Sequence, residues 1–141
     1  MTGVVRVERE IPVPPEDVFD AWTDPESLSI WMAPPPIEVG EAECDPQVGG
    51  RFRIVMVDPT GAMEHYGVYE VVDRPHRLVF SWRAEHLGTL ETRVRVELTP
   101  TDTGTRMVIE HEGLPVEVQP PHAQGWGGIA DKLAAVLGTS A

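Results

Sequence analysis

The sequence predicts an α+β domain in which one long C-terminal helix covers a curved, seven-stranded antiparallel sheet. Between residues 37 and 112, apolar and polar residues alternate with a period of two, and turn sequences such as "DPTGA" and "TDTGT" separate the runs. Short connections of this kind join antiparallel neighbours. After "HEGLP" the apolar spacing becomes that of an amphipathic helix. The pattern therefore predicts a strand, two helices, six strands and a helix.

The N-terminal part of the chain predicts one strand and two short helices. In "VVRVEREI" valines alternate with charged residues, as in a strand with one wet face. "PPEDVFDAW" begins with prolines that suit a first helical turn and spaces Val18 and Trp22 four apart. Asp24 then caps a second helix. Pro14 stands at the cap position of the first helix and offers no side-chain acceptor, so we expect that helix to begin without a side-chain cap.

Alternation assigns one face of the sheet to the core and the other to solvent. In "TLETRVRVEL" the apolar and threonine side chains oppose two glutamates and two arginines. His76 and His86 fall in turn segments and are expected to be solvated. The residues expected on the core face are Phe52, Ile54, Met56, His65, Gly67, Tyr69, Val71, Leu78, Phe80, Trp82, Leu90, Thr92, Val94, Val96, Leu98, Met107, Ile109 and His111.

Length and composition indicate a single domain, residues 1–141, with room for a core that needs no disulfide. The one cysteine, Cys44, has no partner within the chain, and the N-terminal sequence has neither a secretory signal nor a run that could cross a bilayer. We therefore expect a soluble, cytoplasmic protein with no membrane insertion. Asp and Glu number 23 against 11 Lys and Arg, a formal charge of −12, which argues against nucleic acid as a partner.

The motifs of several enzyme classes are absent from the sequence. There is no "GxSxG" for a serine hydrolase, and His111 in "HEGLP" lacks the second histidine of a zinc protease. The glycines near the C-terminus lack the Lys-Ser/Thr of a phosphate-binding loop. Cys44 lies among acidic residues, which raise a thiol pKa. We assign no catalytic residue and expect folding without metal or cofactor.

The remaining candidates for a functional site are polar and aromatic side chains on the core face and on the final helix. His65, Tyr69 and His111 come from sheet positions, while His122 and Trp126 lie four apart on one side of the helix. A neutral imidazole could orient a carbonyl or phenolic ligand, although a histidine hydrogen-bonded within the core is the simpler explanation. The expected ligand-binding residues are Trp126, His122, His65, Tyr69, Trp82, His111, Met56 and Phe80, with no metal ligand among them.

Trp126 is flanked by Gly125, Gly127 and Gly128 in a segment that should be helical. Each interior glycine weakens a helix by roughly 0.5–1 kcal/mol relative to alanine. These glycines either let the helix backbone approach the sheet closely or leave unfilled volume beside the indole. The sequence alone supports both interpretations.

Four stretches of the sequence resemble a known family: "VPPEDVFDAWTDPESLSIWMAPP", "VGGRFRIVM", "HYGVYEVVDRPHRLVFSW" and the terminal "GLP…HAQGWGGIADKLAAVL". They are similar to the START-like (SRPBCC, Bet v 1-like) superfamily, in the branch of the C-terminal domain of the heat-shock-protein-90 ATPase activator. The resemblance implies the helix-grip fold, a seven-stranded antiparallel sheet wrapped around the long C-terminal helix with a cavity between them. In various relatives this cavity holds lipids, polyketides, hormones or other hydrophobic small molecules.

The resemblance leaves the use of the cavity open, so three functions are ranked. The first is binding of a hydrophobic or aromatic small molecule by a carrier, sensor or sequestering protein. The second is polyketide cyclase-like or dehydratase-like catalysis, in which His65, His111 or Tyr69 moves a proton. The third is a chaperone-activator-like interaction module, but no stretch resembles the activator's N-terminal chaperone-binding domain, so chaperone contact is not expected. A homodimer is compatible with all three.

Two structural features would separate these functions. A core-face histidine beside open volume favours the first two, whereas a filled core with a large exposed apolar patch favours the third. The proline-rich segments "MAPPPI" and "GLPVEVQPP" both join helix to sheet. We expect them to be irregular and to lie beside one end of the cavity, where they would form its entrance.

Overall fold

The elements follow the predicted order of strand, two helices, six strands and helix in the computed structural model, which describes residues 2–139. Two short 3-10 turns, η1 and η2, flank β6 and β7. The bounds are β1 (Thr2–Ile11), α1 (Pro15–Trp22), α2 (Pro25–Trp31), β2 (Glu38–Cys44), β3 (Arg51–Asp58), β4 (Gly61–Asp73), β5 (Arg77–Ala84), η1 (Glu85–Leu87), β6 (Thr92–Thr101), β7 (Gly104–Pro115), η2 (Val116–Val118) and α3 (Gln119–Thr139).

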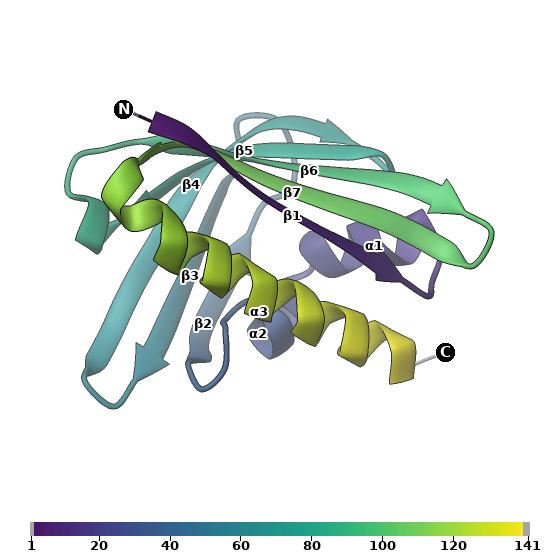
Figure 1. Ribbon diagram of the computed structural model, residues 1–141, viewed down its shortest axis with the longest axis horizontal. Coiled ribbons are helices and arrows are strands. Elements are labelled where there is room, and N and C mark those ends of the chain that lie inside the picture. Colours follow the sequence, from purple (N-terminus) through teal and green to yellow (C-terminus); the bar gives the residue numbers. More distant parts are fainter. Residues whose placement is uncertain (1, 140–141) are drawn as a thin grey trace.

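The strands form one antiparallel sheet in the order β1-β7-β6-β5-β4-β3-β2. Consecutive strands from β2 to β7 are neighbours, and the chain between β1 and β2, through α1 and α2, places these two strands at opposite edges. α3 lies across one face of the sheet, and the strands curve around it (Figure 1). The structure confirms the α+β helix-grip fold that the sequence predicts.

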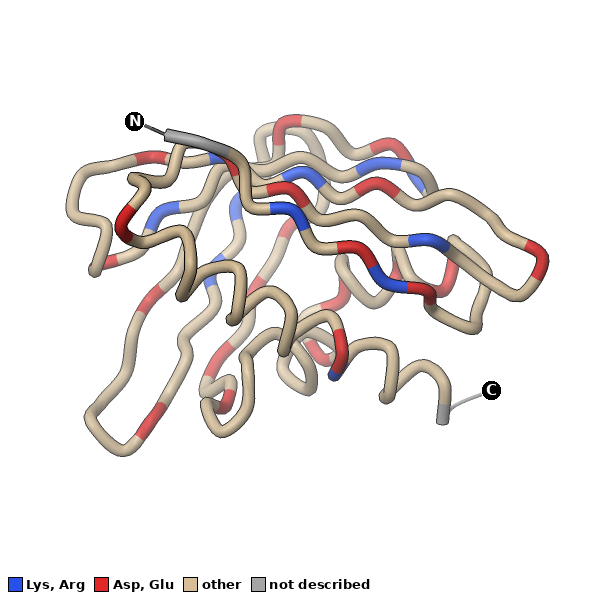
Figure 2. Tube along the Cα trace, in the orientation of Figure 1, with Lys and Arg blue, Asp and Glu red and all other residues tan. Residues whose placement is uncertain are grey.

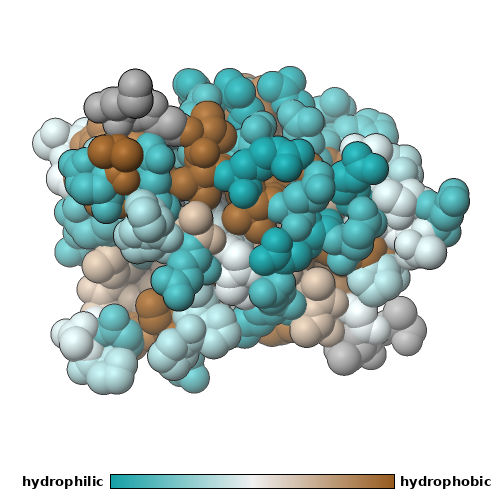
Figure 3. Space-filling view, viewed as in Figure 1, coloured by the Kyte–Doolittle hydropathy of each residue, from teal (hydrophilic) through white to brown (hydrophobic). Residues whose placement is uncertain are grey.

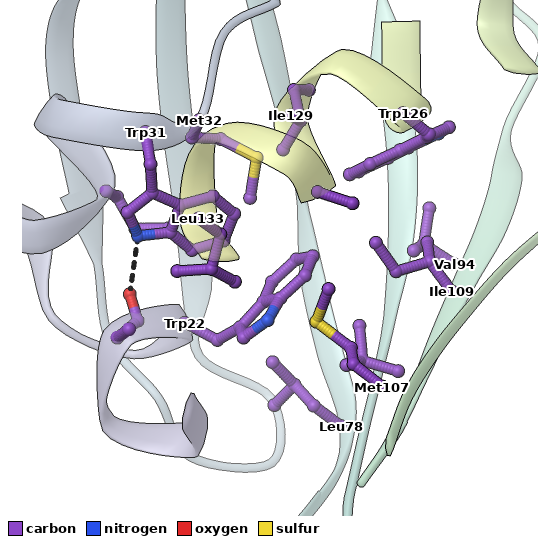
Figure 4. Packing of buried hydrophobic residues seen from close by; sticks show 14 of the residues in the cluster. Trp22, Trp31, Met32, Leu78, Val94, Met107, Ile109, Trp126, Ile129 and Leu133 are labelled. Carbon is purple, nitrogen blue, oxygen red and sulfur yellow. Dashed lines mark hydrogen bonds between the residues drawn. The ribbon is translucent and has the colours of Figure 1, made fainter. Parts of the chain in front are cut away.

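Side chains from the sheet and from all three helices meet around Trp22 in the core (Figure 4). The Trp22 ring centroid lies 4.7 Å from that of Trp31 and 6.2 Å from that of Trp126 on α3. Trp31 is fully buried, and its indole Nε1 donates a hydrogen bond to the Ala21 carbonyl at 3.3 Å. Aromatic pairs at these separations add to the free energy of burial, so the tryptophans join the helices to the sheet.

The strand alternation predicted from sequence is wrong at two positions. It predicts Val71 on the core face, but the register between β4 and β5 shifts between Tyr69 and Val71, and Val72 packs against the core instead. A bulge of this kind moves every later side chain of the strand to the opposite face. Leu90 lies before β6, which begins at Thr92, and is only half-buried.

The two N-terminal helices begin as their sequences indicate. Pro14 precedes α1, and no side-chain hydrogen bond caps that helix. In α2 the Asp24 carboxylate accepts a hydrogen bond from the Ser27 backbone N–H at 3.3 Å. The cap satisfies one of the unpaired N–H groups of the first turn and fixes the point at which α2 begins.

Charged residues are spread along the strands, whereas α3 carries few of them (Figure 2). Within Gln119–Thr139 the only charged residues are Asp131 and Lys132. Asp131 accepts a hydrogen bond from Arg9 of β1 at 2.6 Å, which ties the helix to the edge of the sheet. The space between α3 and the sheet is therefore left mainly to apolar and uncharged groups. Among residues 2–139, no helix combines the length and apolar character needed to span a membrane.

Gly67 allows β4 and β5 to approach each other closely under the Phe52 ring. A Cβ at this position would overlap the Ser81 carbonyl oxygen and lie 2.8 Å from Phe52 Cε1. The Val68 N–H donates to Ser81 Oγ at 2.9 Å, beside this contact. Because the obstructing carbonyl belongs to the backbone of the neighbouring strand, a side chain at residue 67 requires the strands to separate.

We expect Gly67→Ala to lower the free energy of unfolding by roughly 3 kcal/mol, as overpacking of a rigid core does. Urea denaturation measures the change. Gly125→Ala is the control, since a Cβ there would meet only Pro34 Cγ at 3.9 Å, and it should stabilise the helix by roughly 0.5–1 kcal/mol. Equal stabilities for Gly67→Ala and wild type would contradict the close approach described above.

Candidate ligand-binding cavity

A cavity of about 270 Å³ lies between α3 and the β3–β5 part of the sheet. Its walls come from five parts of the chain: the proline loop before β2, the strands, η1, η2 and the first half of α3. Most of the lining is apolar or aromatic, as in small-molecule sites. The lining residues are Pro34, Ile37, Met56, Asp58, Met63, His65, Trp82, His86, Val118, Pro121, His122, Gly125, Trp126 and Ile129.

Five of the residues expected to bind a ligand line this cavity: Met56, His65, Trp82, His122 and Trp126. They come from three different strands and from α3, so only the folded chain brings them together. The indole rings of Trp82 and Trp126 lie 5.4 Å apart, at 55° to each other. Both are 3 % exposed. They supply two adjacent aromatic surfaces on one side of the cavity.

The other three expected residues, Tyr69, Phe80 and His111, lie outside the cavity lining. Tyr69 and Phe80 pack against the Phe52 ring, with centroid distances of 5.7 Å and 5.1 Å. Phe80 also lies 6.3 Å from Trp22, beneath α1. Alternation assigns these side chains to the correct face, but the two N-terminal helices fill the space above that part of the face.

His111 is fully buried behind Trp126, and both of its ring nitrogens have partners. Trp126 Nε1–H donates to His111 Nδ1 at 3.0 Å, so this nitrogen carries no proton. His111 Nε2–H then donates to Thr92 Oγ1 at 2.7 Å, and the Thr92 hydroxyl donates to the Trp82 carbonyl at 2.9 Å. The chain of donors fixes the neutral Nε2–H tautomer. Burial, followed by the charges of His122 and His86, lowers the pKa of His111 to about 3.

His65 is 5 % exposed, and its ring lines the cavity beside Trp82, with a centroid distance of 5.1 Å. Its Nδ1 is buried and has no hydrogen-bond partner in the structure. Burial and the neighbouring His86 lower the pKa of His65 to about 4. The imidazole is therefore uncharged at neutral pH.

His86 and His122 meet at the mouth of the cavity, which corrects the expectation that His86 is merely solvated. His86 is exposed, yet its ring stacks on that of His122, with centroids 5.3 Å apart and Nε2 atoms 3.3 Å apart. His122 Nδ1–H donates to the Val118 carbonyl at 2.8 Å. The sequence does not predict this contact, because His86 in η1 and His122 in α3 lie 36 residues apart in the chain.

The proline loop explains the glycines around Trp126. A Cβ at Gly128 would lie 3.3 Å from Pro34 Cβ, and one at Gly127 would lie 3.4 Å from the Arg9 guanidinium. Gly128 thus lets α3 approach the proline loop, and Gly127 lets it approach an arginine of β1 at the edge of the sheet, as the first interpretation of the sequence expects. Gly125 differs from the other two because it lines the cavity.

Both proline-rich segments border the cavity, as expected. Pro34 and Ile37 come from the loop between α2 and β2, which is irregular, and Val118 and Pro121 come from the second segment. The second segment is more regular than expected. It comprises the end of β7, the 3-10 turn η2 and the first turn of α3, which begins at Gln119.

The family model "Activator of Hsp90 ATPase homolog 1-like protein" matches residues 12–138, which include every lining residue of the cavity. The chain belongs to this family. No curated protein matches the sequence significantly.

Several solved structures share the fold over nearly their whole length. An AHSA1 protein from Silicibacter pomeroyi is 27 % identical, with a TM-score of 0.85, and the match covers 99 % of this chain and 100 % of that one. A protein from Nitrosomonas europaea is 26 % identical, with a TM-score of 0.84 and coverage of 97 % and 95 %. A protein from Mesorhizobium loti is 27 % identical, with a TM-score of 0.81 and coverage of 99 % and 99 %.

The buried histidines should make stability depend on pH between about 7.5 and 5. An imidazole of the unfolded chain takes up a proton near its ordinary pKa of about 6.5, whereas the pKa values of His65 and His111 in the folded protein are about 4 and about 3. Stability is therefore intact well above pH 6.5 and falls as the pH is lowered, because the unfolded state binds more protons. We expect a loss of about 2 kcal/mol for each ring between about pH 7.5 and 5, measured by urea denaturation.

His65→Phe should remove its share of this loss, because phenylalanine does not titrate. His76→Gln is the matched control, since His76 is exposed in the turn between β4 and β5. Carboxylates stay largely ionised above about pH 5, so they contribute little in this window. A wild-type free energy of unfolding that is constant across the same window would contradict the buried, neutral histidines.

Proposed function

We propose that this protein binds a hydrophobic or aromatic small molecule in the cavity between α3 and the sheet, as a carrier, sensor or sequestering protein. The observation that carries the proposal is the cavity of about 270 Å³, lined by Trp82 and Trp126. The family's fold is consistent with a ligand-binding domain. An apolar cavity of about 150 Å³ can hold a benzene molecule, so this one suits a substituted ring or a compound of similar size.

Binding is favoured over catalysis by the state of the histidines. A general base works best with a pKa near the operating pH. His111 has both nitrogens occupied, and the pKa of His65 is about 4. Tyr69 lies outside the cavity lining, and burial raises its pKa beyond the usual range. Of the three residues suggested for proton transfer, only His65 lines the cavity, and it would act as a weak base.

An interaction module of the chaperone-activator type receives less support. On the face covered by α3, apolar side chains form small patches separated by hydrophilic ones (Figure 3). An open cavity beside a core-face histidine is the feature expected of a small-molecule site. We further propose a cytoplasmic protein, a location that suits its single cysteine. Its charge of −12 argues against a nucleic-acid partner, and the homodimer stays a prediction.

Filling the cavity tests the proposal. Gly125→Leu places a side chain into the cavity, because Gly125 lines it and a Cβ there has only ordinary contact with Pro34 at 3.9 Å. We expect the variant to fold and to bind 4-propyltoluene or 4-propylphenol at least tenfold more weakly than wild type. Tryptophan emission reports binding, since Trp82 and Trp126 line the cavity, and isothermal titration calorimetry gives the affinity.

Ala123→Leu is the matched control, because Ala123 is exposed on the same turn of α3 and lies outside the cavity lining. It should bind as wild type does. Binding that is unchanged by Gly125→Leu would move the ligand to another site. A wild-type protein that binds none of a panel of alkylbenzenes, alkylphenols and medium-chain alcohols would reject the proposed function.

A further inference from the structure

The polar groups of the cavity accept hydrogen bonds and bring no fixed positive charge. Among its described lining residues, the only formally charged side chain is Asp58, at the end of β3, and no lysine or arginine contributes. The other titratable groups of the lining are His65, His86 and His122. Arginines of the sheet form ion pairs elsewhere, such as Arg93 with Glu70 at 2.6 Å.

Asp58 is held as a carboxylate. The backbone N–H of Thr60 donates to its Oδ1 at 2.8 Å, and the Thr60 hydroxyl donates to the same oxygen. These hydrogen bonds lower the pKa of Asp58. A carboxylate accepts about four hydrogen bonds, so it retains capacity for a donor on a ligand.

Two of the three histidines in the lining have lowered pKa values. Partial desolvation and the charge of His122 lower the pKa of His86, as burial does for His65. At the mouth of the cavity His86 Nε2 lies 3.3 Å from His122 Nε2, and His86 Nδ1 lies 3.0 Å from Met63 Sδ. A second proton on the pair would place two like charges 3.3 Å apart.

We propose that the cavity selects an aromatic ring that bears a hydrogen-bond donor, a phenolic hydroxyl or an amino group, and rejects aromatic carboxylates. This inference rests on the proposed function. A carboxylate entering the cavity would lose its hydration without gaining a cationic partner and would meet the charge of Asp58. A hydroxyl or amino group would instead meet the remaining acceptor capacity of the Asp58 carboxylate, while the ring packs against Trp82 and Trp126. The protein's net charge of −12 also weakens the binding of carboxylates, because it repels anions.

The test compares four probes of the same shape by calorimetry at pH 8: 4-propylphenol, 4-propylaniline, 4-propyltoluene and 4-propylbenzoate. We expect the phenol and the aniline to bind roughly fivefold more tightly than 4-propyltoluene, as one additional hydrogen bond would give. The benzoate should bind at least tenfold more weakly than the phenol. Benzoate affinity equal to or above that of the phenol would overturn the selectivity and leave the proposed function standing.

Asp58→Asn removes the negative charge while keeping a side chain that can form the same turn with Thr60. It should improve benzoate binding roughly threefold and narrow the difference between benzoate and phenol. Asp73→Asn is the control, because it changes the net charge equally at a residue outside the cavity lining. If Asp58→Asn does not fold, the wild-type series alone decides. Failure of all four probes to bind would reject the proposed function together with this inference.

Discussion

The hydrogen bond from the Trp126 indole to His111 holds the helix layer and the sheet layer in register. It joins α3 to strand β7, and Thr92 carries the connection on to the backbone of β5. Every polar atom in this chain of contacts lies in the core, where an unpaired donor or acceptor costs about 1–3 kcal/mol. The same indole then forms one wall of the cavity, so the position of the wall is set by a bond within the core.

The cavity exists because α3 cannot cover the whole concave face of the sheet. Trp22 and Trp31 of α1 and α2 fill the space above one part of that face, around Phe80 and Tyr69. Above β3, β4 and β5, the loop that contains Pro34 and the turn η1 lie against α3. The space beside His65 stays unfilled. Close packing of α3 against this loop depends on the absence of a side chain at residue 128. The cavity is thus bounded by two rigid elements, the proline-containing loop and the helix α3 packed against it.

The chemistry of the cavity depends on the lack of lysine and arginine among its described lining residues. Arginine side chains pair with carboxylates on the outer surface, and α3 contributes only two charged residues. Loss of water, followed by the charges of neighbouring histidines, lowers the pKa values of His65 and His111 and keeps both rings neutral near pH 7. A pocket with aromatic walls, one carboxylate and no lysine or arginine is suited to recognition by shape and by a small number of hydrogen bonds. The low pKa values of His65 and His111 make these two side chains weak candidates for proton transfer near pH 7.

Local patterns in the sequence were enough to predict the order of the elements and the faces of most strands, because apolar periodicity and turn chemistry are local properties. The family was predicted from the resemblance of four stretches of the chain to its members. The local patterns assign Met56, His65 and Trp82 to the core face, and His122 and Trp126 to one side of the helix. Only the folded chain shows which of these side chains meet at the cavity. It also shows that both ring nitrogens of His111 are hydrogen-bonded, to Trp126 and Thr92, and that His86 contacts His122. These outcomes depend on sheet curvature, on a bulge in β4 and on contacts between residues far apart in the chain, and none of these leaves a periodic signal in the sequence.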